Sequence, residues 1–367
     1  MTTPPPTILH VFPTFAVGGA QIRFAMLANA MGAALRHRII SLDGRQDTAA
    51  RLDPGLDVGF IDRIGAKNAF LASIAAYRRM LRDLRPDILM TYNWGAIEFA
   101  FANLLPLTRH VHVVDGFGSD EFFRRLRRRC IANRIALRNS VTVVPSMVLR
   151  DIATREWSLP EDRVRYIPNG IDLSRFAPSP PRLADQPVVI GTVAALRPEK
   201  NVARLILAFA RLPASARLHI VGDGECRASL ERLAGGLELG DRVAFLGYSD
   251  AIPEHLAGWD VFALSSDTEQ MPIGVLEAMA AGLPVASTDV GDVRHMVAEE
   301  NAALVAGKDA GSLAASLRAL VDDAGLRVRL GAANRIRAER VYDQATMFAA
   351  WRDLLDGVLA TPVAEAA

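Results

Sequence analysis

The feature that most constrains the fold is an alternation of short apolar runs with longer helical patterns, which occurs twice along the chain. The first series starts with TILHVFP at residues 7–13 and continues to DILMTYN at 87–93. The second starts with PVVIGTVAAL at 187–196 and ends with PVASTDVG at 284–291. Such alternation is typical of βαβ units and parallel sheets. The sequence therefore predicts two doubly wound α/β domains.

Between the two series, proline, Asn-Gly and serine residues concentrate in RYIPNGIDLSRFAPSPPRLADQP, which is typical of a linker. A chain of 367 residues is also longer than one typical domain. We expect a first domain over residues 1–168, a linker over 169–187 and a second domain over 188–344. A further helical pattern covers 345–360.

Composition excludes several classes of protein. The two cysteines, Cys130 and Cys226, lie far apart without histidine or cysteine at metal-binding spacing, so we expect neither a disulfide framework nor a zinc site. The first residues carry no basic segment before their apolar run, and no apolar stretch is long enough to span a bilayer. We expect a cytoplasmic protein without a signal peptide or a spanning helix.

Charge is distributed unevenly along the chain although the net charge is only +1. Residues 1–165 hold 23 lysines and arginines against 15 acidic residues, which leaves 19 against 26 for the remainder. One half could therefore face an anionic surface or ligand. Chance combined with docking of the two domains is the alternative explanation.

Ligands of open parallel sheets bind at the carboxyl ends of the strands, so the loops there hold the candidate residues. Gly18 and Gly19 lie between the first predicted strand and its helix, where bare backbone can approach a phosphate. A tight turn explains the same pair. Asp43 ends the second strand, where a nicotinamide-dependent oxidoreductase would bind ribose. That alternative fails because the glycine pattern G-x-G-x-x-G is missing.

Two further loops carry charge. In ALRPEKN, Arg197 and Lys200 follow a predicted strand and precede a predicted helix. They could neutralise a diphosphate. A pair of solvated loop cations is the alternative explanation. In SDTEQMPIGVLEAMA, the acids Glu269 and Glu277 flank a predicted helix start. The loop between them offers free backbone N–H groups to an anion. It comprises Gln270, Met271, Pro272, Ile273 and Gly274.

These motifs together resemble a known family. The chain carries E-x7-E at Glu269 and Glu277, followed by AMAAGLPVASTDVG. Before these residues it carries, in this order, YIPNGIDLSRF, ALRPEKN, VGDGE and FLGY. It is similar to the family 4 retaining glycosyltransferases of GT-B fold. The resemblance covers most of the chain and implies two Rossmann-like domains facing across a cleft. It also implies that helix 345–360 crosses back to the first domain, with Trp351, Leu354 and Leu355 as its packed side; an oligomerisation helix is the alternative.

The resemblance implies roles for the site residues. Glu277 would bind the ribose hydroxyls of a nucleotide sugar, Glu269 the hydroxyls of the transferred sugar, and loop 270–274 the sugar and phosphate. Arg197 and Lys200 would stabilise the departing diphosphate, Gly18 and Gly19 would approach it, and Tyr248 would line the base pocket. Because no D-x-D motif is present, we expect no metal ion and no cofactor besides the nucleotide-sugar co-substrate.

One loop departs from the family pattern. Where many relatives carry a histidine after a strand of the first domain, this chain has Asp115. An ionised aspartate accepts hydrogen bonds but cannot donate them, whereas a histidine can do both. Asp115 would accept a hydrogen bond from a sugar hydroxyl of the donor or from the acceptor. Asp120 or Glu121 could instead reach the site, with Asp115 as a loop cap.

The segment 120–140 combines seven arginines with Phe122, Phe123, Leu126, Cys130 and Ile131 at helix-like spacing. It resembles a basic amphipathic helix on an anionic membrane surface, at the inner face of the membrane. A solvated helix with its apolar stripe on the sheet is the alternative.

The resemblance therefore predicts sugar transfer from a nucleotide sugar to a glycan or lipid-linked acceptor, in cell-surface polysaccharide synthesis. No nucleic-acid partner is expected. A catalytically silent nucleotide-sugar-binding module is the second hypothesis.

Overall fold

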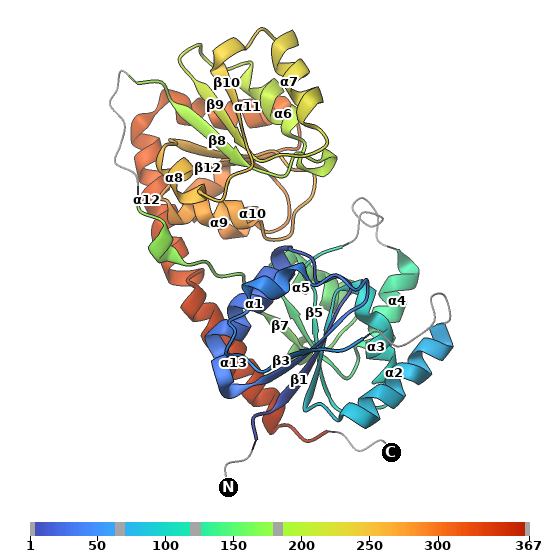
Figure 1. Ribbon diagram of the computed structural model, residues 1–367. Helices are drawn as coiled ribbons and strands as arrows, with labels where there is room; N and C mark the ends of the chain where they lie inside the picture. The colour runs from blue at the N-terminus through green and yellow to red at the C-terminus, as the bar shows by residue number, and fades with distance from the viewer. Residues whose placement is uncertain (1–3, 63–69, 118–125, 179–185, 364–367) are drawn as a thin grey trace. The chain divides into compact units, whose positions relative to one another are not determined.

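A computed structural model describes residues 4–62, 70–117, 126–178 and 186–363. The chain divides into two compact units, which Figure 1 shows. Unit 1 comprises residues 1–168 and 348–367, and unit 2 comprises residues 169–347. The predicted pair of doubly wound domains is confirmed, because each unit holds a parallel sheet with helices packed around it.

The described part of unit 1 forms a seven-stranded parallel sheet in the order β3-β2-β1-β4-β5-β6-β7. Its strands are β1 (Thr7–Phe12), β2 (Arg36–Ser41), β3 (Val58–Phe60), β4 (Ile88–Tyr92), β5 (Arg109–Val113), β6 (Val141–Val144) and β7 (Val164–Tyr166). Its helices are α1 (Gly19–Met31), α2 (Phe70–Leu84), α3 (Ile97–Ala102), α4 (Arg127–Ala136) and α5 (Met147–Asp151). The central strands β1 and β4 are almost wholly buried, as expected for a parallel sheet covered on both faces.

The described part of unit 2 forms a six-stranded parallel sheet in the order β10-β9-β8-β11-β12-β13. Its strands are β8 (Val189–Val193), β9 (Arg217–Val221), β10 (Val243–Gly247), β11 (Val261–Leu264), β12 (Val285–Thr288) and β13 (Val305–Ala306). Its helices are α6 (Val202–Phe209), α7 (Arg227–Gly236), α8 (Ile252–Ala257), α9 (Ile273–Ala280), α10 (Val293–Met296), α11 (Ala310–Asp322) and α12 (Ala324–Val341).

The last helix, α13 (Gln344–Ala360), contains the division between the units, which falls after Met347. Trp351 and Leu355 are buried and Leu354 is half-buried, so these three residues form the packed side of the helix. Residues 169–178 belong to unit 2, where Ile171 pairs with Asp343 and Phe176 is buried.

The core of unit 1 contains four buried histidines, which form two hydrogen-bonded groups. In the first group, Nδ1 of His10 on β1 lies 3.1 Å from the hydroxyl of Tyr92. Nε2 of His10 lies 3.0 Å from Nδ1 of His37. Burial, and for His37 also the charge of Arg38, lowers both histidine pKa values, that of His37 to about 4. These rings are therefore neutral at pH 7.

The second group is a chain of contacts through β5. Ser140 Oγ lies 2.6 Å from His110 Nδ1, His110 Nε2 lies 2.8 Å from Thr91 Oγ1, and Thr91 Oγ1 lies 2.7 Å from His112 Nδ1. Burial lowers the pKa of both His110 and His112 to about 3. Every member of this chain is buried, so the polar atoms rely on one another instead of on water.

Two buried asparagines form a hydrogen-bonded group in the core of unit 2. Asn301 donates to Val285 O at 2.7 Å and accepts from Val285 N at 2.9 Å. Asn334 donates to Leu283 O and to Asn301 Oδ1, and accepts from Ala298 N. The remainder of this core is mostly aliphatic.

Candidate functional site

The strand order of unit 2 reverses between β8 and β11, and such switch points open a crevice at the carboxyl ends of the strands. The loop after β8 holds Arg197 and Lys200. The loop after β11 holds Glu269. Sequence reasoning placed these three residues at strand ends, and the topology brings their loops to the same point of the sheet.

Lys200 and Glu269 form the central contact of this site. Lys200 Nζ donates to Glu269 Oε1 at 2.6 Å, and the hydroxyl of Ser266 donates to the same oxygen at 2.7 Å. The Glu269 side chain is only 12% exposed. Both donors bond Oε1, and no described residue donates to Oε2, which can therefore accept from a ligand hydroxyl.

A second ion pair, missed by sequence reasoning, fixes the two loops together. Arg204 on α6 contacts Asp267 at 2.5 Å, and Asn201 Nδ2 donates to the other oxygen of Asp267 at 3.0 Å. Asn201 has a left-handed φ of 43° and caps α6 by accepting from Arg204 N. Lys308 Nζ donates to Asp267 O at 2.8 Å. The asparagine before an apolar helix was the available sequence signal for this arrangement.

Arg197 is exposed, and its guanidinium makes no hydrogen bond or ion pair to other described residues. It lies at the N-terminus of a short 3₁₀ turn, Pro198–Lys200. An unpaired guanidinium beside a lysine can bind a diphosphate with its planar fork.

Glu277 lies one turn inside α9, which begins at Ile273. Burial raises the pKa of its carboxyl to about 7, and the nearby charge of Arg175 opposes the shift. Glu277 thus titrates near neutral pH. Perturbed carboxyls of this kind cluster at functional sites.

The residues of loop 270–274 have different surroundings. Met271 is buried, and its sulfur accepts a hydrogen bond from Asn169 N at 3.2 Å, so its side chain is part of the core and only its backbone is available to a ligand. Pro272 is the N-cap of α9 and Ile273 is exposed. Gly274 permits close packing as well, because a Cβ there would lie 3.2 Å from the ring of Phe262. Gln270 has a buried Oε1 without a hydrogen-bond partner among the described residues.

Tyr248 follows the edge strand β10 and is 73% exposed. Its hydroxyl donates to Asp250 at 2.6 Å. Since β9 separates β10 from β8 in the sheet, Tyr248 lies two strands away from the loop of Arg197.

In unit 1 the strand order reverses between β1 and β4. Gly18 and Gly19 lie in the loop after β1 and at the start of α1, where Gly18 is an extended N-cap without a side-chain bond. A Cβ on Gly18 would lie 2.8 Å from Gln21 Oε1, whereas a Cβ on Gly19 would meet open space. A side chain at Gly18 would therefore displace the Gln21 amide, whereas one at Gly19 would displace nothing.

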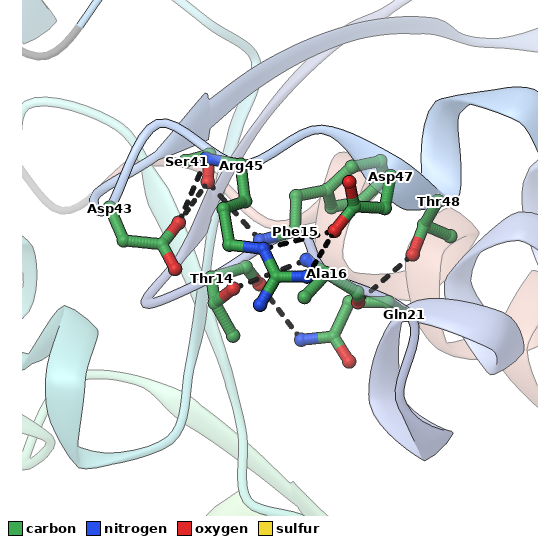
Figure 2. A network of polar contacts seen from close by, with 9 residues as sticks. All are labelled: Thr14, Phe15, Ala16, Gln21, Ser41, Asp43, Arg45, Asp47 and Thr48. Atoms are coloured by element: carbon green, nitrogen blue, oxygen red, sulfur yellow. Dashed lines mark hydrogen bonds and ion pairs between the residues drawn. The ribbon is translucent and has the colours of Figure 1, made fainter.

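Figure 2 shows how the loop before Gly18 is anchored by the segment after β2. Ser41 Oγ accepts from Phe15 N at 3.1 Å, and Thr48 Oγ1 donates to Ala16 O at 3.0 Å. Gln21 Nε2 donates to Thr14 O at 2.9 Å. These bonds fix the backbone that would approach a phosphate.

Asp43, the residue considered for ribose binding, belongs to this anchor. Its Oδ1 accepts from Ser41 Oγ at 2.9 Å and from Arg45 N at 3.0 Å. Burial by itself would raise its pKa, but hydrogen bonds from Thr14, Arg45 N and Ser41 lower the pKa below its usual value. Asp43 therefore has a structural role that explains its position.

Asp115 follows β5 and forms an ion pair with Arg23 on α1, whose Nη1 lies 2.5 Å from Asp115 Oδ1. The backbone N–H of Asp115 donates to Asn93 Oδ1 at 2.8 Å, and Asn93 has a left-handed φ of 54°. Asp115 Oδ2 is buried and has no hydrogen-bond partner among the described residues. Sequence reasoning found Asp115 but missed Arg23, because 92 positions separate them. The alternatives Asp120 and Glu121 lie outside the described residues.

Helix α4 covers part of the predicted basic segment; residues 118–125, including Phe122 and Phe123, lie outside the described residues. Leu126 and Cys130 are half-buried, whereas Ile131 is 60% and Ile135 42% exposed. The helix is therefore packed through one side and presents isoleucines among exposed arginines on the other. These arginines of α4 are Arg127, Arg128 and Arg134. Within the described ranges, no helix is both long and apolar enough to cross a membrane.

Comparison with solved structures identifies the fold. The chain is similar to HepE of Anabaena in complex with UDP, with a TM-score of 0.79 and 19% identity over 96% of this chain and 100% of that one. It is also similar to sucrose-phosphate synthase of Thermosynechococcus elongatus, with a TM-score of 0.77 and 20% identity over 96% and 99%. The two units form a GT-B fold.

Family models identify the chain further. A model for glycosyltransferase family 4 matches residues 17–175, and a model for glycosyl transferases group 1 matches residues 175–337. The chain belongs to glycosyltransferase family 4. The resemblance inferred from the motifs is thereby confirmed.

Curated relatives differ in how much of their length is matched. The chain is 28% identical to the lipopolysaccharide core biosynthesis glycosyltransferase LpsD of Rhizobium meliloti, over 92% of this chain and 95% of that one. It is 27% identical to the UDP-Gal:alpha-D-GlcNAc-diphosphoundecaprenol alpha-1,3-galactosyltransferase of Escherichia coli, over 70% and 72%. It is 33% identical to a GDP-mannose-dependent phosphatidylinositol monomannoside mannosyltransferase of Corynebacterium glutamicum, but spans only 53% of that relative's length.

Proposed function

We propose that this glycosyltransferase moves a sugar from a nucleotide sugar to a glycan or lipid-linked acceptor, with retention of anomeric configuration and without a metal ion. The observation that carries the proposal is the cationic pair at the switch point of unit 2. Lys200 is held against Glu269, and Arg197 is exposed beside it. Two cations at this point can stabilise the charge that develops on a departing diphosphate, the part that a metal ion plays elsewhere.

The remaining residues bind the donor in this proposal. Glu269 accepts hydrogen bonds from hydroxyls of the transferred sugar, and Glu277 accepts them from the ribose. The backbone of loop 270–274 binds sugar and phosphate. Gly18 and Gly19 approach the diphosphate, and Tyr248 lines the base pocket.

The transfer breaks the bond from the anomeric carbon to the phosphate oxygen and forms a bond to the acceptor oxygen on the same face of the sugar. The departing phosphate takes the proton of the acceptor hydroxyl, so no side-chain nucleophile is required. Asp115, held by Arg23, accepts a hydrogen bond from a hydroxyl of the sugar or the acceptor.

The names of the relatives support the class of acceptor and a place in polysaccharide or lipopolysaccharide synthesis. One relative acts on a diphosphoundecaprenol-linked sugar, and another belongs to lipopolysaccharide core biosynthesis. A lipid-linked acceptor suits peripheral association with the inner face of the membrane. The exposed arginines and isoleucines of α4 are suited to an anionic surface.

Release of nucleoside diphosphate from a panel of nucleotide sugars, with and without diphosphoprenol-linked acceptors, tests the proposal. A catalytically silent binding module, the second hypothesis, would bind a donor in calorimetry but release nothing with any acceptor. NMR of the product's anomeric proton tests retention. Turnover that persists in EDTA supports metal independence, and turnover that EDTA abolishes and Mg²⁺ restores contradicts it.

Sedimentation with vesicles tests the membrane surface. Binding should be stronger to anionic than to neutral vesicles and should weaken with salt, with about 1 kcal/mol from each arginine near the surface. The variant Arg127→Glu/Arg134→Glu should lose it, whereas Arg232→Glu on α7 should not. Equal partitioning to both vesicle types would contradict this part of the proposal.

A further inference from the structure

A pocket of about 360 Å³ opens at the amino ends of β5, β6 and β7, the opposite end of the unit 1 sheet from Asp115. Four segments line it: residues 103–110, residues 136–141, Arg163 and the C-terminal residues 358–363. Its volume lies in the range of small-molecule sites. None of the residues assigned to sugar transfer lines it.

Three arginines supply all the charged side chains in the described lining. Arg109 is the first residue of β5, Arg138 precedes β6 by three residues, and Arg163 directly precedes β7. Because β5, β6 and β7 are parallel neighbours, their amino ends lie side by side. The pocket therefore has three positive charges and no carboxylate among its described lining residues.

The guanidinium groups have unused donors. Arg109 Nε donates to Thr361 O at 2.6 Å, and its two Nη atoms make no hydrogen bond within the described residues. The side chains of Arg138 and Arg163 make neither a hydrogen bond nor an ion pair in the same set of residues. Three like charges around one hollow repel one another, so an anion that fills it gains both their attraction and their hydrogen bonds.

The rest of the lining is mixed. Leu105, 53% exposed, contributes apolar surface together with Pro106, Val358 and Val363. At the floor, His110 is buried and uses both ring nitrogens on Ser140 and Thr91. The pocket thus offers donors to an anionic group and an apolar wall to the remainder of a ligand.

We propose that this pocket binds a phosphate monoester with a short apolar substituent, at a site separate from the nucleotide-sugar site. A phosphate monoester carries about 1.5 to 2 negative charges at pH 7, which matches three arginines better than a carboxylate does. Arginine forks bind its oxygens in pairs. The apolar wall takes the substituent.

Calorimetric titration of the full chain with hexyl phosphate tests this proposal. We expect saturable binding that is at least tenfold tighter than that of hexanoate or inorganic phosphate and that weakens with salt. The variant Arg138→Ala/Arg163→Ala should raise Kd at least tenfold. Arg155→Ala is the matched control, because this exposed arginine of unit 1 lies outside the pocket and pairs with Asp151.

The clamp of unit 2 also attracts phosphate, so Arg197→Ala serves as a second variant. Binding that Arg197→Ala abolishes and the double variant retains would overturn the proposal, as would no saturable binding to the wild type. Loss of binding in the double variant supports the proposal if the melting temperature of that variant stays within a few degrees of wild type and the Arg155→Ala control binds normally. If the alanine variant is less stable than this, Arg138→Gln/Arg163→Gln is used in its place. If hexyl phosphate binds, vesicles with phosphatidic acid separate the two sources of a phosphate monoester. Vesicle binding that the double variant loses identifies a lipid headgroup, and no vesicle binding identifies a free phosphate monoester.

Discussion

Unit 1 and unit 2 use the same kind of parallel sheet but bury different polar groups. In unit 1 four histidines lie in the core, whereas His219, His255 and His295 of unit 2 are exposed or half-buried. In unit 2, Asn301 and Asn334 bond buried backbone groups of Val285 and Ala298, and their amides do not titrate. The difference implies that the two units respond to falling pH in opposite directions, because the buried histidines of unit 1 resist protonation whereas protonation of Glu277 removes a buried charge from unit 2.

The largest expected effect is selective unfolding of unit 1 in acid. The folded pKa of each buried histidine is below its unfolded value of about 6.5, so its stabilisation is present above that pH and is lost as pH falls toward 4. At pH 5 we expect a loss of about 2 kcal/mol for each histidine that stays neutral. Asp57, which opposes the shift of His37, protonates only below this range.

Scanning calorimetry from pH 8 to pH 5, with hydrogen exchange to assign the transitions, measures this loss. His37→Gln should reduce the pH dependence of the unit 1 transition, and His295→Gln on the surface of unit 2 should leave it unchanged. Parallel loss of stability in both units would break the comparison.

The second prediction concerns the cations of unit 2. Arg197→Ala or Lys200→Ala should lower turnover roughly a hundredfold or more, because each removes a positive charge where the leaving group becomes negative. Steady-state kinetics at saturating donor measures this. Arg232→Ala, an exposed arginine on α7, is the control. Near-normal turnover in either site variant would mean that the clamp is assigned wrongly.

The third prediction concerns Asp115 in unit 1. Asp115→Asn should keep donor affinity and lower turnover at least tenfold, since a charged hydrogen bond contributes roughly 1.5 to 3 kcal/mol. It also removes the charge that Arg23 pairs with. Kinetics and donor calorimetry decide the role, with Asp47→Asn as a surface control. Unchanged turnover would move the role to Asp120 or Glu121, and lost donor binding would make Asp115 a ground-state contact.

The smallest effect is expected at Glu277. Its pKa of about 7 lies above the usual value, so the carboxyl is mostly protonated at pH 6 and ionised at pH 8. If only the ionised form binds ribose, donor affinity should rise by about tenfold across this range, in proportion to the ionised fraction. Glu277→Gln should flatten the profile, whereas Glu254→Gln on the surface of α8 should not. A flat profile in the wild type would remove Glu277 from donor binding.

The sequence allowed the positions of candidate residues to be predicted where they directly follow a strand. Lys200 and Glu269 follow strands, and parallel strands place their carboxyl ends at one edge of a sheet, so their proximity follows from the pattern. The family motifs then supplied the fold. The burial of Met271 could not be predicted, because the sequence does not distinguish an apolar loop residue that contacts a ligand from one that packs into the core.

Contacts distant in sequence were not predictable. Arg23 pairs with Asp115 through the reversal of strand order between β1 and β4, which no local pattern records. The arginines of the pocket, Arg109, Arg138 and Arg163, lie at or before the starts of three separate strands and share no motif. The four histidines alternate on strands like any half-buried residue, so their burial depends on helices packed from elsewhere in the chain.

The chain of contacts from Ser140 to His112 also restricts where its hydrogens lie. Thr91 Oγ1 has one hydrogen and meets two neutral rings, so it donates to one ring and accepts from the other. If His110 carries its proton on Nδ1, facing Ser140, its Nε2 accepts from Thr91, which must then accept from Nδ1 of His112. If His110 carries its proton on Nε2, Thr91 donates to Nδ1 of His112, whose proton then lies on Nε2. The two imidazoles therefore hold the same tautomer and change it together, so their ring ¹⁵N resonances should report one shared equilibrium.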